Sequence, residues 1–133
     1  MHKGSCACGA IRFEIDAELG EIALCHCGQC RKAQGTGFAI NAPVPAESFR
    51  IVAGAEHFAE YQSSPGKQRC FCRRCGSPII SRRAGHPQVR VRLGVIDTPI
   101  AARPAYHIYA ASKAEWDEIH DTLPQYAELE PAR

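Results

Sequence analysis

Two stretches of the chain alternate between hydrophobic and polar residues, which is the period of a strand with one buried face. In residues 11–15, Ile, Phe and Ile alternate with Arg and Glu, and in residues 89–93 two Val and one Leu alternate with two Arg. Gly and Pro residues separate these and several shorter runs. The shorter β-like runs lie at Glu21–Leu24, Phe38–Ala42, Ser48–Val52 and His57–Tyr61. Several short strands with frequent turns predict a mostly β, sandwich-like domain.

Helical signals are few. The clearest begins at Ser112, where Glu115 three residues later gives a capping-box pattern. Trp116 and Ile119 follow at helical spacing, and we expect them to be buried against the sheet. The pattern predicts one short C-terminal helix, and a second short helical turn is expected at Cys27–Gln34.

The bulk composition fits one domain of ordinary size. The chain has 133 residues, of which 45% are hydrophobic and 23% charged, and we expect a single domain over residues 1–133. No stretch approaches the roughly 18 apolar residues that a membrane span needs. The first residues also lack the apolar core of a signal peptide. We therefore expect a cytoplasmic protein without a membrane partner.

Eight cysteines in a chain of this size need an explanation. A disulfide scaffold is typical of secreted proteins, whereas in a reducing compartment metal binding competes strongly. The cysteines fall as Cys6-x-Cys8, Cys25-x-Cys27-x-x-Cys30 and Cys70-x-Cys72-x-x-Cys75. Thiolates so close in sequence hold one ion easily, so the spacing predicts metal sites, with zinc as the metal that suits closed sulfur sites without redox chemistry.

The first predicted site is structural. Cys72-x-x-Cys75 followed by Gly76 is typical of a zinc-knuckle turn, which supplies two ligands. Cys6-x-Cys8, again followed by a glycine, offers the other two. A zinc ion on these four sulfurs would join segments about 65 residues apart and add stability that a small core lacks.

The second predicted site is open. Cys25, Cys27 and Cys30 give three ligands in six residues, and three protein ligands with one free position is the arrangement of a catalytic zinc. A thiol entering that position would lose its proton and become a poised nucleophile. Cys70 leaves alternatives open: it could close this site as a fourth ligand, or it could be a free cysteine of the core.

The charge is unevenly distributed although the net charge is only +2. Residues 61–96 contain no Asp or Glu, whereas the C-terminal region is acidic. The basic side chains of this stretch are Lys67, Arg69, Arg73, Arg74, Arg82, Arg83, Arg90 and Arg92. Solvated surface charge that partly pairs with the acidic region is one interpretation, and an anion-attracting face around the third cysteine group is the other. Nucleic-acid binding is disfavoured, because aromatic residues for base stacking do not interleave with this stretch apart from Phe71.

Four segments in order give the chain a resemblance to a known family. The sequence resembles the glutathione-dependent formaldehyde-activating enzymes, whose domain is shared with centromere protein V, over nearly its whole length. The segments that carry the resemblance are residues 4–10 (Gly-Ser-Cys-Ala-Cys-Gly-Ala), 25–31 (Cys-His-Cys-Gly-Gln-Cys-Arg), 69–76 (Arg-Cys-Phe-Cys-Arg-Arg-Cys-Gly) and 107–124 with its His-Ile-Tyr, Ser-Lys-Ala-x-Trp and Leu-Pro pieces.

This resemblance implies a β-tent fold and two zinc ions. It implies a structural zinc on Cys6, Cys8, Cys72 and Cys75 and a catalytic-type zinc on Cys25, Cys27 and Cys30, with Cys70 not a ligand. The implied activity is a carbon–sulfur lyase reaction run in reverse, in which glutathione or another small thiol condenses with formaldehyde to S-(hydroxymethyl)glutathione or its analogue.

Roles for the remaining polar residues follow less directly. His26 lies between two predicted ligands and is a candidate proton acceptor, although an exposed or structural histidine is the commoner case. His107 and Tyr106 could line a pocket or simply pack, and the arginines of residues 69–92 could bind the carboxylates of glutathione. The alternative function is a non-catalytic, zinc-stabilised module that binds a protein partner, with both zinc sites saturated.

Overall fold

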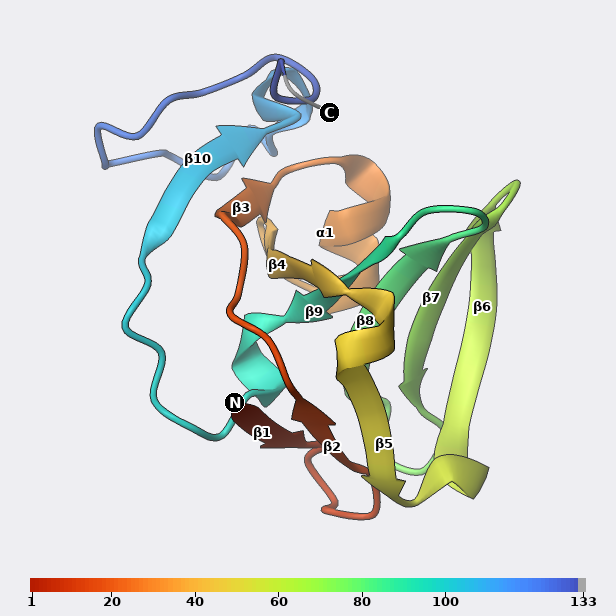
Figure 1. Ribbon diagram of the computed structural model, residues 1–133. Helices are drawn as coiled ribbons and strands as arrows, with labels where there is room; N and C mark the ends of the chain where they lie inside the picture. The colour runs from red at the N-terminus through yellow and green to blue at the C-terminus, as the bar shows by residue number, and fades with distance from the viewer. Residues whose placement is uncertain (132–133) are drawn as a thin grey trace.

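Two β-sheets form the body of the protein in the computed structural model, which describes residues 1–131 (Figure 1). The strands are β1 (His2–Ser5), β2 (Arg12–Ile15), β3 (Ile22–Cys25), β4 (Ala39–Pro45), β5 (Phe49–Ala53), β6 (Phe58–Ser64), β7 (Lys67–Cys72), β8 (Pro78–Arg83), β9 (Gln88–Arg92) and β10 (Pro104–Ile108). The helix α1 covers Gly28–Gln34, and 3-10 helices lie at Ala46–Ser48, Ala55–His57, Leu93–Val95 and Ala110–Ser112. The prediction of a mostly β fold is confirmed.

The small sheet has the order β1-β2-β5, and the large sheet has the order β10-β3-β4-β9-β8-β7-β6. All neighbours are antiparallel except β10 and β3, which run parallel. The strand β3 is buried at every position because it lies between β10 and β4. The last residue of β3 is Cys25, so a central strand of the sheet delivers the first cysteine of the middle group.

The main core lies between the two sheets. Alternate residues of the small sheet, including Phe13 and Ile15, pack with Val44, Ile79 and Val91 of the large sheet. These side chains are almost completely buried, and burying each one stabilises the fold by roughly 1.5–3 kcal/mol. Cys6 and Cys72 lie in this same cluster, so the core holds the first cysteine group at its edge.

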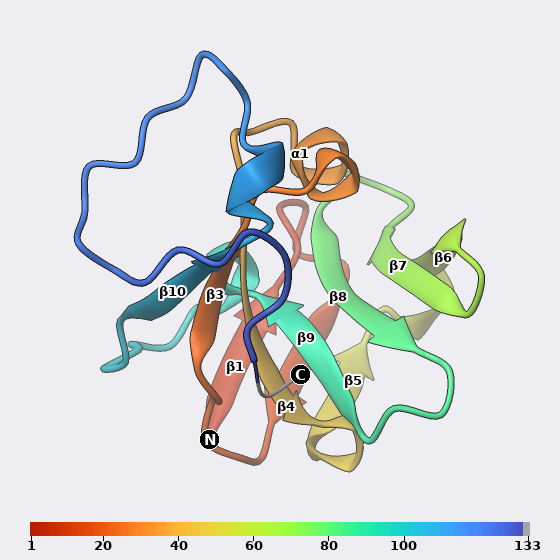
Figure 2. The same cartoon turned by 90° about the horizontal axis from the view of Figure 1, so that it is seen from above.

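The predicted C-terminal α-helix is wrong. The chain forms only a 3-10 turn at Ala110–Ser112, and Trp116 is 70% exposed instead of buried against the sheet. The reason lies in the backbone that follows. The chain must return along β10, where the amides of His107 and Tyr126 bond to the carbonyls of Pro124 and His107 (Figure 2). A continued helix from Ser112 would carry the chain away from this position.

The helical turn at Cys27–Gln34 is confirmed as α1. Cys27 is its N-cap, and the Cys27 sulfur accepts a hydrogen bond from the backbone N–H of Cys30 at 3.3 Å. Gly35 ends the helix in the left-handed conformation, with its N–H bonded to the carbonyl of Arg31 at 2.8 Å. No helix among residues 1–131 is long and apolar enough to cross a membrane.

Candidate metal centres

The structure brings the eight cysteines into two groups and one isolated residue. Within each group the sulfur atoms all lie within 4.8 Å of one another. The first group is Cys6, Cys8, Cys72 and Cys75, and the second is Cys25, Cys27 and Cys30. Both sets are therefore able to hold a metal ion, and both consist of thiols alone, which suits zinc.

The four-cysteine group is built by two tight turns. The N–H of Gly9 bonds to the carbonyl of Cys6 at 3.0 Å, and the N–H of Gly76 bonds to the carbonyl of Cys72 at 2.7 Å. Both glycines have φ near +80°, at 77° and 82°, a conformation that favours glycine. The two turns are tied by a hydrogen bond from the N–H of Ala7 to the Ser77 hydroxyl at 2.9 Å.

The sulfur distances in this group fit a tetrahedral zinc site. Four sulfurs at 2.3 Å from a zinc ion would lie about 3.8 Å apart. Cys6 and Cys8 have their sulfurs 3.6 Å apart, and those of Cys8 and Cys72 are 3.9 Å apart. Hydrogen bonds from the side chain and backbone of Ser77 lower the pKa of Cys75 to about 5, which makes it an ionised ligand at neutral pH.

The three-cysteine group is assembled from the end of β3 and the start of α1. Cys25 and Cys30 are buried, while Cys27 is half-buried. Hydrogen bonds from Cys25 and Cys27 lower the pKa of the Cys30 thiol far below its usual range, and the same contacts raise the pKa of Cys25. The Arg69 guanidinium nitrogens lie 3.7 and 3.8 Å from the Cys30 sulfur, and their positive charge lowers the pKa of this thiol as well.

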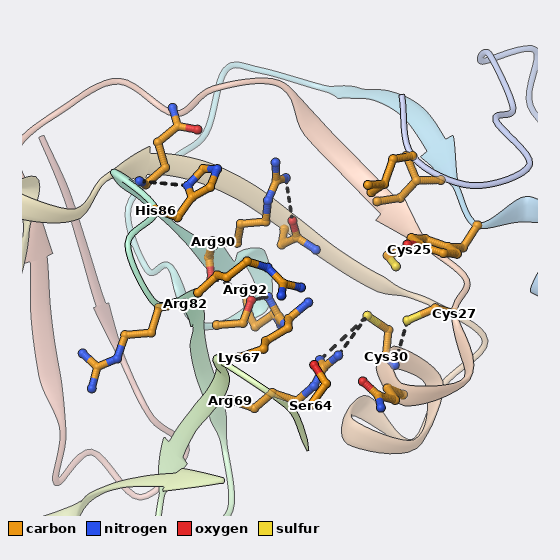
Figure 3. Close-up of a pocket in the computed structure, with 18 of the residues that line it drawn as sticks. Cys25, Cys27, Cys30, Ser64, Lys67, Arg69, Arg82, His86, Arg90 and Arg92 are labelled. Atoms are coloured by element: carbon orange, nitrogen blue, oxygen red, sulfur yellow. Dashed lines mark hydrogen bonds between the residues drawn. The ribbon is translucent and has the colours of Figure 1, made fainter. Parts of the chain in front are cut away.

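A basic cavity opens beside this group. It has a volume of about 830 Å³, and Figure 3 shows the three cysteines at one side with Lys67 and Arg69 facing them, whereas Arg82 points away and pairs with Glu60. Its basic lining residues are Lys67, Arg69, Arg82, Arg83, Arg90 and Arg92. Over residues 1–131, no Asp or Glu lines it. Of the two interpretations of the basic stretch, the structure favours a basic face, but this face adjoins the second cysteine group and not the third, because Lys67, Arg69 and Arg92 of β7 and β9 line the same cavity as Cys30.

Two arginines of this cavity are deeply buried. Arg69 is 8% exposed and Arg92 is 4% exposed. Arg92 contacts only neutral oxygens in the described chain, namely Gln34 Oε1, the Ser81 hydroxyl and the Arg90 carbonyl. Burial lowers the pKa of Arg92, and burial together with the charge of Arg69 lowers that of Lys67. Positive charge at this depth favours an anionic ligand.

Cys70 belongs to neither group. It is 1% exposed and lies in the main core with Ile80 and Val91. Burial raises its pKa to about 11, as expected for an inert core thiol. Of the alternatives that the sequence leaves open, the structure places Cys70 as a core cysteine.

His26 points away from the cavity and into the protein. It is 0% exposed, and its Nε2 lies 2.8 Å from His107 Nδ1. His107 Nε2 in turn lies 2.9 Å from a carboxylate oxygen of Asp121, so the Asp121 carboxylate accepts from His107 and His107 accepts from His26. Burial lowers the pKa of His26 and keeps the ring neutral.

This chain of hydrogen bonds anchors the loop between Cys25 and Cys27 to the C-terminal segment. Asp121 was not predicted from the sequence, because it lies far from His26 in the chain and close to no pattern that links it to His26 or His107. His107 and Tyr106 are not among the lining residues of the basic cavity; Tyr109 and Ile108 are. The sequence pointed to Ile108 and Tyr109 only through the His-Ile-Tyr run at residues 107–109.

Comparisons with known proteins agree with one another. A family model described as "Glutathione-dependent formaldehyde-activating enzyme" matches residues 1–112. A Halomonas elongata protein named "Putative glutathione-dependent formaldehyde-activating enzyme" is 36% identical over 127 residues, covering 88% of this chain and 80% of the relative. A Phaeosphaeria nodorum protein of the same name is 22% identical and covers 92% of this chain and 56% of the relative.

A solved structure shows the same architecture. The crystal structure of a Rhodobacter sphaeroides protein superposes with a TM-score of 0.62 at 30% sequence identity. The match covers 74% of this chain and 91% of that protein. The two-sheet arrangement described above is therefore found in a protein whose structure was determined by experiment.

Proposed function

Because the chain belongs to the glutathione-dependent formaldehyde-activating enzyme family, we propose that it joins a small thiol, with glutathione as the first candidate, to formaldehyde. The reaction class is that of a carbon–sulfur lyase run in the direction of synthesis. The observation that carries the proposal is a three-cysteine group that no fourth cysteine of residues 1–131 joins and that opens on a cavity lined by six Lys and Arg residues.

Cys25, Cys27 and Cys30 are the residues that would hold a zinc ion at this site. A bound zinc ion would lower the pKa of a thiol that coordinates it, so that the sulfur is a thiolate at neutral pH. In the reaction the sulfur attacks the carbon of formaldehyde, a carbon–sulfur bond forms, and the former carbonyl oxygen takes a proton. Atoms balance, because the thiol proton and the aldehyde are both retained in the hydroxymethyl product.

The protein residues around the group bind and orient the thiol. Glutathione carries two carboxylates, and guanidinium groups bind carboxylates with two parallel hydrogen bonds. Lys67 and Arg90 lie across the cavity from the cysteines (Figure 3). A thiol whose sulfur reaches Cys30 would therefore place its carboxylates among these side chains.

Arg69 interacts with the cysteine group itself. Its guanidinium contacts the Cys30 sulfur and offsets the negative charge that three thiolates bring together. His26, bonded to His107, holds the loop that carries Cys25 and Cys27 and has no direct path to the cavity. We therefore assign His26 a positioning role in place of proton transfer.

Cobalt substitution tests the proposal directly. The cobalt-loaded protein should show a new thiolate-to-cobalt absorption band when glutathione is added, and the Cys27→Ser variant should not. Mixing glutathione and formaldehyde with the zinc-loaded protein should raise the rate of S-(hydroxymethyl)glutathione formation, followed by NMR. An unchanged cobalt spectrum with glutathione and with other small thiols would contradict the proposal and would favour a saturated, non-catalytic module.

A further inference from the structure

A second cavity lies behind the basic one, between α1 and the strands β6, β7 and β8. Its volume is about 430 Å³, within the range of small-molecule sites. Gln29, Arg69 and Arg92 line both cavities, so they form the wall between them. The second cavity does not contain any of the metal-binding cysteines among its described lining residues.

The lining of this cavity is largely apolar. Its apolar side is formed by Ala33, Tyr61, Cys70, Phe71, Pro78 and Ile80. Tyr61 is 62% exposed, which is unusual for so large a side chain and places an aromatic ring at the edge of the cavity. The apolar or aromatic part of a ligand would be removed from water in this cavity, and that burial favours its binding.

The cavity also contains two buried donors without a partner. Arg69 Nε and the Ser63 hydroxyl are buried, and neither has a hydrogen-bond partner among the residues that the structure describes. Both residues line this cavity, and they lie on the adjacent strands β6 and β7. Buried polar groups are normally satisfied, so two orphaned donors on one cavity wall point to an acceptor that a ligand supplies.

The charged side chains that line this second cavity are all positive. Lys32, Arg69 and Arg92 line the cavity, and no Asp or Glu among residues 1–131 does. A zinc ion on three thiolates would carry a net charge of about −1, which balances only one of the two buried guanidinium groups. The wall between the cavities therefore keeps positive charge even when the neighbouring metal site is filled.

We propose that this cavity binds a small organic carboxylate with an apolar or aromatic body. Its carboxylate oxygens accept hydrogen bonds from Arg69 and Ser63, and its body packs against Tyr61, Phe71 and Pro78. The site is separate from the thiol site and does not depend on the reaction proposed above. Because Arg69 also contacts Cys30, a bound carboxylate would lie two contacts away from the metal centre.

Titration calorimetry on the zinc-loaded protein tests this with a matched pair of ligands. The probe is 3-phenylpropionate, and the control is its neutral amide, 3-phenylpropanamide, which has the same apolar body. We expect the carboxylate to bind at least about tenfold more tightly, because hydrogen bonds to a charged acceptor are stronger than those to a neutral amide oxygen. Equal affinities, or no binding of the carboxylate, would overturn the proposal.

Four variants locate the site. Ala33→Trp, at an exposed helix position on the cavity wall, should abolish binding by filling the space, whereas Ala101→Trp, an exposed position outside both cavities, should not. Ser63→Ala should weaken binding about threefold or more. Lys67→Gln, which lines only the basic cavity, should change the affinity less than Ala33→Trp does. If Lys67→Gln has the larger effect, or if Ala33→Trp has none, the carboxylate binds elsewhere and the inference is wrong.

Discussion

The two cysteine groups of this protein share their ligand chemistry but not their surroundings. The four-cysteine group joins two glycine-ended turns at the edge of the main core, with sulfur distances that suit a closed site. The three-cysteine group lies at the end of a buried strand and opens on a basic cavity. The difference shows how one ligand type can suit two kinds of site: four sulfurs match a closed structural metal site, and three sulfurs beside a cavity match the open site that we propose for the substrate.

The largest effect is expected from Cys72→Ser in the four-cysteine group. Cys72 lies in the core, and its group links segments more than 60 residues apart. Loss of this metal should lower the free energy of unfolding by more than about 3 kcal/mol, because metal binding contributes directly to folding. Urea unfolding and metal analysis measure both quantities. A variant that keeps its stability after losing one metal would show that the group is not structural.

Cys27→Ser should separate the second group from the first. Cys27 is half-buried at the start of α1, so the fold should tolerate the change with a loss of about 1–3 kcal/mol. Thiol-dependent activity should fall at least about a hundredfold, because the set of ligands is broken. The comparison is made by steady-state kinetics and thermal unfolding on the same preparation. If stability and activity fall together as in Cys72→Ser, the contrast between the two groups is lost.

The pH dependence of alkylation should separate the cysteines of the metal-free protein. Cys75 has a pKa lowered to about 5, so its thiolate is present above that pH and is lost as the pH falls through it. Cys70 has a pKa raised to about 11, so at pH 7 only about one molecule in ten thousand is a thiolate. Iodoacetamide followed by peptide mass spectrometry should find the exposed Cys75 modified well before the buried Cys70 at pH 7. Early modification of Cys70 would contradict its place in the core.

The smallest effect is expected from Cys70→Ala. Since Cys70 lies outside both groups, this variant should bind two metal ions and keep its thiol-dependent activity. Removing one buried sulfur should cost about 1–2 kcal/mol of stability. Metal analysis decides the point: loss of one metal equivalent would make Cys70 a ligand of the second group, and the proposed vacancy would disappear.

Much of the fold follows from local pattern. The alternation at residues 11–15 and 89–93 predicted β2 and β9, and the shorter runs predicted β3 to β6. The strands β1, β7, β8 and β10 were not predicted. In β7 the reason is physical: Lys67 and Arg69 line the cavities, and Gln68 between them bonds to Gln62 of β6, so no hydrophobic alternation marks the start of this strand.

The sequence by itself determined which neighbouring cysteines meet in one turn, because ligands two or three residues apart are brought together locally. It also determined the paired glycines that shape those turns. That the turn of Cys6 and Cys8 meets the turn of Cys72 and Cys75 depends on the tertiary structure. Only the tertiary structure decided the fate of Cys70, the hydrogen-bonded chain from His26 to Asp121 and the position of the buried arginines beside Cys30. These depend on contacts between strands distant in sequence, and such pairings are fixed by packing and register, which no local pattern encodes.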